Sequence, residues 1–135
     1  MNIQEECENK FEKANELYFN KQYKDAIRLY QECLDMTDID EFQFKNHCIY
    51  NIGTAYIKLH DFNMALFYYK QILENDENNK QYKKIADVYF NIGFCYLKLN
   101  DYYLAYKTFK KSNTLQPDDS ATLKAINLLK IKILK

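Results

Sequence analysis

Apolar residues recur every three or four positions along most of the chain, a spacing that places them on one face of a helix. Short polar segments interrupt the pattern, among them ENDENN at 74–79. Only two glycines and one proline occur, and because these residues mark turns and breaks, their scarcity favours long helices. The pattern predicts seven helices, at 4–20, 23–36, 43–60, 62–74, 80–99, 102–115 and 119–134.

The helical pattern also repeats along the chain. Residues 50–73, YNIGTAYIKLHDFNMALFYYKQIL, align with residues 90–113, FNIGFCYLKLNDYYLAYKTFKKSN, at a constant offset of 40. Identical residues recur at this offset, among them Asn51, Gly53, Tyr56, Leu59, Asp61 and Ala65, which return as Asn91, Gly93, Tyr96, Leu99, Asp101 and Ala105. A more degenerate copy, KANELYFNKQYKDAIRLYQECL, lies at 13–34 with an offset of 39. Each copy spans two predicted helices, so the repeating unit is a helical hairpin.

These copies resemble the tetratricopeptide repeat, whose pattern is W-x2-L-G-x2-Y, then A-x3-F, then P. The matching residues are Ile49, Ile52, Gly53, Tyr56, Ala65 and Tyr69 in the second copy, and Tyr89, Ile92, Gly93, Tyr96, Ala105, Phe109 and Pro117 in the third. The first copy matches through Ala14, Leu17, Ala26 and Tyr30. Lys10 and Lys13 stand at two of its apolar places, which is typical of an end repeat with one face in water.

The resemblance implies an all-α, right-handed α-solenoid of antiparallel helical hairpins. It places the repeats at about 7–40, 46–79 and 86–119, and a capping helix at about 119–134. We expect residues 1–135 to form a single domain, because 135 residues with 47% hydrophobic composition suffice for one core.

Small residues are expected where the two helices of a hairpin meet. Gly53 and Gly93 let the second helix approach closely, and Ala65 and Ala105 face them from that helix. Large residues then fill the space between hairpins, at Tyr56, Tyr69, Tyr96 and Phe109.

The resemblance further implies that the first helix of every hairpin lines a concave surface for an extended partner. The residues predicted to bind a peptide there are Phe11, Asn15, Phe19, Tyr50, Asn51, Lys58, Phe90, Asn91, Phe94 and Lys98, with Glu12, His47, Thr54 and Asp87 on the same faces. An asparagine amide both donates and accepts, so Asn51 and Asn91 can pair with a peptide backbone. Alternatively these asparagines bond across neighbouring helices or face solvent, and an aromatic such as Phe94 packs in a core.

Relatives that act as co-chaperones grip a carboxylate with two lysines, two asparagines and an arginine. Asn15 and Asn51 match the two asparagines, but Phe11 and Asp87 stand at the lysine places and Asn91 at the arginine place. Because a carboxylate needs cationic donors, chaperone docking by that clamp is not expected.

Overall charge points to no nucleic-acid or membrane partner, since nineteen basic and nineteen acidic residues cancel. No apolar run approaches the roughly 20 residues that span a bilayer, and the N-terminus lacks a leader pattern, so we expect a soluble, cytoplasmic protein. Cys7, Cys33, Cys48 and Cys95 form no C-x-x-C pair and are predicted to be reduced, structural thiols rather than disulfide or metal ligands.

Catalysis finds no support in the sequence. His47 and His60 lack a nucleophile arrangement, and no phosphate loop, zinc spacing or G-x-S-x-G motif occurs. We therefore expect no enzymatic activity, cofactor or metal.

Two functions remain open. The first is a protein-interaction module that holds a peptide or helix of a partner protein in its concave groove. The second is a structural segment that stacks on itself or on a larger scaffold, through an acidic first hairpin, a basic end and a last helix that is apolar most of the way round. The apolar residues of that helix are Leu123, Ile126, Leu128, Leu129, Ile131, Ile133 and Leu134.

Overall fold

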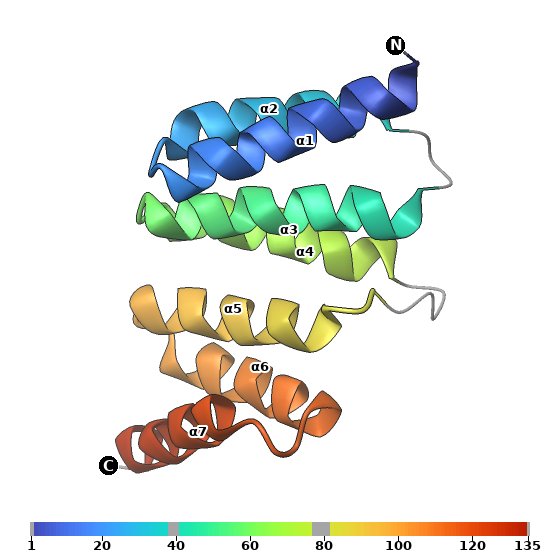
Figure 1. Ribbon diagram of the computed structural model, residues 1–135. Helices are drawn as coiled ribbons and strands as arrows, with labels where there is room; N and C mark the ends of the chain where they lie inside the picture. Colours follow the sequence, from blue (N-terminus) through green and yellow to red (C-terminus); the bar gives the residue numbers. More distant parts are fainter. Residues whose placement is uncertain (1, 38–40, 77–81, 135) are drawn as a thin grey trace. The chain divides into compact units, whose positions relative to one another are not determined.

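A computed structural model describes residues 2–37, 41–76 and 82–134, and over these residues it is entirely helical. The helices are α1 (Ile3–Phe19), α2 (Tyr23–Met36), α3 (Phe42–Lys58), α4 (Phe62–Asn75), α5 (Ile85–Lys98), α6 (Tyr102–Leu115) and α7 (Ser120–Ile133). Their arrangement as antiparallel pairs joined by tight turns confirms the predicted all-α class (Figure 1).

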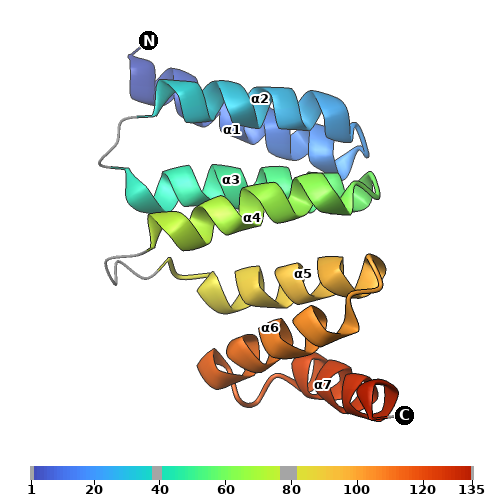
Figure 2. The ribbon, with the colours of Figure 1, turned by 180° about the vertical axis from the view of Figure 1, so that it is seen from behind.

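The chain divides into two compact units, Met1–Tyr82 and Lys83–Lys135. The first unit contains the hairpins α1–α2 and α3–α4, with α2 packed on α3. Within it, α1 and α3 lie toward the viewer in Figure 1, whereas α2 and α4 do so in the reverse view of Figure 2. The second unit contains the hairpin α5–α6, on which α7 packs through α6. A single domain over residues 1–135 stays a prediction.

The hairpin turns share one backbone conformation. Lys21, His60 and Asn100 hold positive φ angles of 64°, 60° and 64° at equivalent repeat positions. In the second hairpin the His60 N–H donates to the Ile57 carbonyl at 2.9 Å and the Asp61 N–H to the Tyr56 carbonyl at 2.9 Å. These bonds satisfy carbonyls at the end of the first helix, as in a Schellman motif. His60 lies exposed in its turn, as expected.

The second helix of each hairpin then begins at once. Asp61 caps α4 by accepting from the Met64 N–H at 3.2 Å, and Asp101 caps α6 by accepting from the Leu104 N–H at 3.2 Å. An aspartate oxygen satisfies one of the unpaired N–H groups of a first turn. The repeated aspartate is therefore a helix start signal.

Helix pairs approach closely at the two glycines. A Cβ atom on Gly53 would lie 2.9 Å from ring carbons of Tyr69, and one on Gly93 would lie 2.9 Å from ring carbons of Phe109. Both rings are buried. The aromatic residue of the second helix thus occupies the space that a side chain on the first helix would need. Tyr69 and Phe109 were expected to fill the space between hairpins, whereas their rings lie against the glycine of their own hairpin.

Helix α5 was predicted to begin at residue 80. Residues 80 and 81 lie outside the described residues, and for residues 82–84 the prediction was wrong. The helix begins at Ile85, and residues 83–84 form a turn. Tyr82 explains the late start, because its N–H donates to an oxygen of Asp76 at 3.2 Å and its buried side chain contacts α3. A tertiary anchor overrides the local helix propensity.

The four cysteines are free and buried. Cys7, Cys33 and Cys48 form one core cluster of the first unit. Burial raises the pKa of the Cys33 thiol to about 12, with a smaller contribution from Cys7, and raises the pKa of the Cys95 thiol to about 12. These thiols stay protonated near neutral pH and behave as small apolar side chains.

Candidate functional site

The candidate surface of the first unit is the face of α1 and α3. Tyr30 reaches it from α2, where its hydroxyl donates to the Asn15 side-chain oxygen. The Asn51 side chain hydrogen-bonds the same hydroxyl, and because the Tyr30 proton goes to Asn15, the Asn51 amide is the donor. Asn15 and Asn51 are thus brought together from two helices by one buried tyrosine.

A second polar cluster lies one repeat further along. Thr54 donates to the Tyr50 carbonyl at 3.0 Å, so the Tyr69 hydroxyl, 2.8 Å from the Thr54 oxygen, is the donor in that pair. The Tyr50 ring meets the Tyr69 ring edge to face, with centroids 5.7 Å apart. Thr54 stands where the first repeat has Asn15. In both hairpins, therefore, the hydroxyl of a tyrosine on the second helix pairs with a polar side chain on the first helix.

The second unit replaces this polar pair with an apolar one. Phe109 has no hydroxyl, and the equivalent of Thr54 is Phe94. Phe90 meets the buried Phe109 edge to face at 5.2 Å, and Phe90 and Phe94 both pack against the core of this unit. The ammonium of Lys98 lies over the Phe94 ring, 5.5 Å from its centre. Asn91 is half-buried on the same helix.

The remaining predicted residues differ in exposure. Phe11 packs against Tyr30, Phe44 and His47 with ring centres 5.2 to 5.6 Å apart. Phe19 by contrast is 79% exposed. Lys58 and Lys98 are exposed at the end of their helices. Phe11 is thus mainly a packing residue, whereas Phe19 presents apolar surface to solvent.

Sequence reasoning missed Tyr82 as part of this face. Its hydroxyl lies 3.1 Å from Nδ1 of His47, and its ring centre lies 6.4 Å from that of Tyr50. The only signal was an aromatic residue just after a polar segment. The Tyr82 side chain covers part of the α3 face, so less of that face is left open to a partner.

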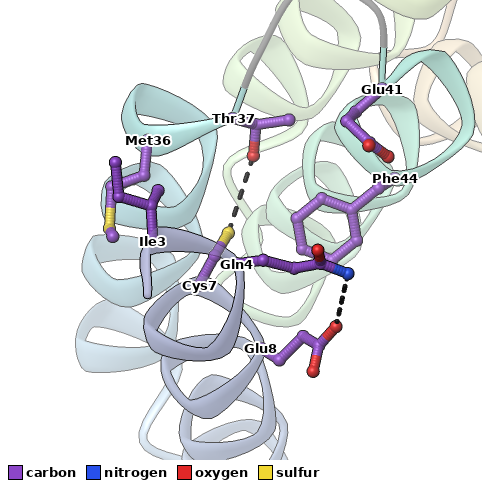
Figure 3. Close-up of a pocket in the computed structure, with 8 residues that line it drawn as sticks. All are labelled: Ile3, Gln4, Cys7, Glu8, Met36, Thr37, Glu41 and Phe44. Atoms are coloured by element: carbon purple, nitrogen blue, oxygen red, sulfur yellow. Dashed lines mark hydrogen bonds between the residues drawn. The ribbon is translucent and has the colours of Figure 1, made fainter. Parts of the chain in front are cut away.

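Sequence reasoning also missed a pocket of about 610 Å³ in the first unit, at the start of α1, the end of α2 and the start of α3 (Figure 3). It is lined by Ile3, Gln4, Cys7, Glu8, Met36, Thr37, Glu41 and Phe44. Cys7 lies at its base, with its sulfur 3.6 Å from the Thr37 hydroxyl oxygen. At the mouth, the Gln4 amide donates to the Glu8 carboxylate at 3.3 Å.

In residues 2–37, 41–76 and 82–134, no three His, Cys, Asp or Glu side chains gather as metal ligands would. Within the same ranges no helix combines the length and apolarity needed to cross a bilayer.

The tetratricopeptide repeat family model matches residues 47–79 and 86–119. These matches fall on the α3–α4 and α5–α6 hairpins. The sequence matched no curated protein.

Solved structures share the fold at low sequence identity. The OM64 tetratricopeptide domain of Arabidopsis is 22% identical with a TM-score of 0.79, and the match covers 97% of this chain and 99% of that one. The first such domain of Spaghetti (RPAP3), bound to the HSP90 peptide SRMEEVD, is 17% identical with a TM-score of 0.79, covering 96% and 94%.

The second domain of human RPAP3, in complex with the HSP70 peptide SGPTIEEVD, is 15% identical with a TM-score of 0.76, covering 96% of this chain and 98% of that one. At these identities the likeness concerns the fold. The degenerate first copy forms the same kind of hairpin as the two matched repeats, and α7 follows the third. Taken with the family match, this shows that the chain belongs to the tetratricopeptide repeat family.

Proposed function

We propose that this chain is a non-catalytic interaction module that holds an extended peptide or a helix of a partner protein against the first helices of its hairpins. The observation that carries the proposal is the half-buried amide of Asn51, held by the Tyr30 hydroxyl. An amide has two donors and an acceptor oxygen, more than this one bond uses. A side chain already fixed by the core loses little entropy when it binds a backbone.

Aromatic residues on the same helices supply the apolar contact that such a peptide needs. Tyr50 is half-buried beside Asn51, and Phe19 is largely exposed at the end of α1. Rigid aromatic side chains are favoured at binding surfaces because they bury area at low entropic cost. Phe90 and Asn91 repeat the Tyr50 and Asn51 pair on α5.

Two structural neighbours bind chaperone peptides that end in EEVD. Such peptides are strongly acidic, and their recognition calls for cationic side chains. At the first lysine place this chain has Phe11, which packs on Phe44 and His47, and at the second it has Asp87, exposed on α5. We therefore propose a less acidic ligand, recognised by backbone hydrogen bonds and apolar anchors.

The test is a peptide-display selection on the immobilised chain, followed by affinity measurement on the selected sequences. Asn51→Ala combined with Asn91→Ala should weaken binding about 10-fold or more, as the loss of two backbone-directed amides predicts. Tyr30→Phe is the comparison variant: it removes the hydrogen bond that fixes Asn51 but leaves both amides in place, so it should weaken binding less than the double variant. Equal affinity of the double variant and the wild-type chain would sink the proposal.

A second candidate function is a structural role, in which copies of the chain stack on one another or on a larger scaffold. The observation in its favour is the apolar outer face of α7, where Leu128 is 69% exposed and Ile131 is 62% exposed. A helix that closes a repeat array needs a polar outer face, and this one is largely apolar.

A further inference from the structure

The pocket of the first unit is built to receive aliphatic side chains. Ile3, Met36 and Phe44 form its walls, and the thiol of Cys7 lies at its base (Figure 3). Its volume of about 610 Å³ lies within the range of about 300–1,000 Å³ that is usual for ligand sites. Ile3 is 66% exposed, which is unusual for isoleucine in a chain with a sufficient core.

The mouth of this pocket is acidic. Glu8 and Glu41 line it. Residues 2–12 contain four glutamates and only one lysine. That lysine, Lys10, pairs with Glu32 at 3.8 Å. Glutamates in the first turn of α1 are explained by the helix dipole, but Glu8 and Glu12 lie beyond that turn. The site therefore favours an apolar group that carries positive charge beside it.

The outer face of α7 has the complementary chemistry. Ile126 and Leu129 are buried in the core of the second unit, which leaves Leu128, Ile131 and Leu134 facing outward. Lys124 precedes Leu128 by one helical turn and so lies on the same stripe. Between Ser120 and Leu134 the helix carries three lysines and no acidic residue. This surface is both apolar and basic.

We propose that the pocket formed by α1, α2 and α3 is the docking site for the outer face of α7 of a second copy of this chain. Leu128 and Ile131 enter between Ile3, Met36 and Phe44, while Lys124 and Lys130 meet Glu8 and Glu41. The inference rests on the second candidate function, self-assembly, and is independent of peptide binding by Asn51. Because the two surfaces differ, the contact is heterologous, and each added copy presents a new α7 to the next.

Sedimentation velocity tests the association first. The weight-average mass of the wild-type chain should rise between about 10 µM and about 1 mM, and the rise should weaken as salt is increased. Leu128→Glu combined with Ile131→Glu should weaken self-association at least about 10-fold, since both side chains are exposed and their replacement leaves the core intact. A wild-type chain that stays monomeric at about 1 mM overturns both the docking site and the self-assembly function.

Charge reversal then tests the site itself. Glu8→Lys with Glu41→Lys reverses the pocket, and Lys124→Glu with Lys130→Glu reverses α7. Each double variant alone should associate at least about 10-fold more weakly, whereas an equimolar mixture should regain association, because a basic pocket then meets an acidic helix. Glu16→Lys with Glu74→Lys is the matched control for charge away from the pocket and should associate like the wild-type chain.

The outcomes separate the two levels of the inference. Loss in each variant and recovery in the mixture support the docking site. Self-association that persists unchanged in the pocket variant overturns the site while leaving self-assembly standing. Neither result depends on the Asn51 face, so peptide binding is tested separately. Circular dichroism confirms that each variant is folded before its mass is interpreted.

Discussion

At the scale of single residues, the fold depends on two glycines that exist to make room for rings. Tyr69 cannot move away from Gly53 freely, because it is fully buried and its hydroxyl is bonded to Thr54 at 2.8 Å. Any side chain at position 53 must therefore displace the ring or push the helices apart. Helix propensity and packing oppose each other here, since alanine is the better helix former.

We predict that Gly53→Ala destabilises the chain by up to about 2 kcal/mol. Alanine stabilises the helix by about 1 kcal/mol through its higher helix propensity. Its Cβ would lie only 2.9 Å from ring carbons of Tyr69, and this overpacking destabilises the fold by about 1–3 kcal/mol. Urea unfolding measures the change. In a double-mutant cycle, Tyr69→Leu should cost less in the Gly53→Ala background than in the wild-type chain, because the smaller side chain relieves the clash. Additive effects would contradict the packing explanation.

The positive-φ residues of the hairpin turns allow the opposite kind of prediction. Lys21 has a φ angle of 64°, a conformation that costs a residue with a Cβ about 1–2 kcal/mol. Lys21→Gly should stabilise the chain by about 0.5–1 kcal/mol after the entropy of glycine in the unfolded state is counted. Asn100→Gly is the matched control at φ 64° and should gain less, since asparagine tolerates this region. A loss of stability at Lys21→Gly would show that its side chain has a role in the turn.

Buried thiols give the chain a pH dependence in the alkaline range. Burial raises the pKa of Cys33 and Cys95 to about 12, whereas an unfolded thiol titrates near about 8.5. Between these values the unfolded chain loses protons that the folded chain keeps, so stability is full below about pH 8.5 and falls as the pH rises toward 12. The urea midpoint should therefore be lower at pH 10 than at pH 8. The fall should be smaller in Cys33→Ala with Cys95→Ala, and an equal fall would contradict the assignment to thiols.

At the scale of elements, the helices could be predicted because several signals agree. Apolar periodicity and the short polar segments between the helices predicted where each helix lies. The repeat offset then transferred each position to the next hairpin. The start of α5 could not be predicted, since nothing local shows that Tyr82 would be held by Asp76 and by His47 on α3.

The candidate site was predictable only in part for the same reason. The offset placed Asn51 and Asn91 at one repeat position, and Tyr50 and Phe90 at another. It could not show that Tyr30 joins Asn15 to Asn51, because that contact depends on side-chain reach across three helices. The pocket was likewise invisible, since its walls come from three helices that meet only in the folded chain.

The cross-helix hydroxyls give a prediction at this scale. Tyr69→Phe should cost about 1 kcal/mol, because it leaves the half-buried Thr54 hydroxyl without its donor. Combined with Thr54→Phe, it creates the pair that the second unit already uses, Phe94 with Phe109. The double variant should therefore recover part of the loss in a urea titration. Further destabilisation by Thr54→Phe would show that the two hairpins do not pack alike.

At the scale of the whole molecule, repeat proteins have stability that is local to each hairpin and its neighbours. The division at Tyr82 and Lys83 makes this testable. Gly93→Ala strains the α5–α6 hairpin, because the added Cβ would lie 2.9 Å from ring carbons of Phe109. Hydrogen exchange should then accelerate in α5, α6 and α7 by more than it does in α1 and α2, because neighbouring interfaces attenuate the effect. Gly53→Ala is the matched variant and should shift the acceleration to the first unit. If both variants speed exchange equally over all helices, the chain unfolds as one cooperative body. Exchange should then be compared at high and low protein concentration, to see whether contact between copies makes the exchange rates differ between the two units.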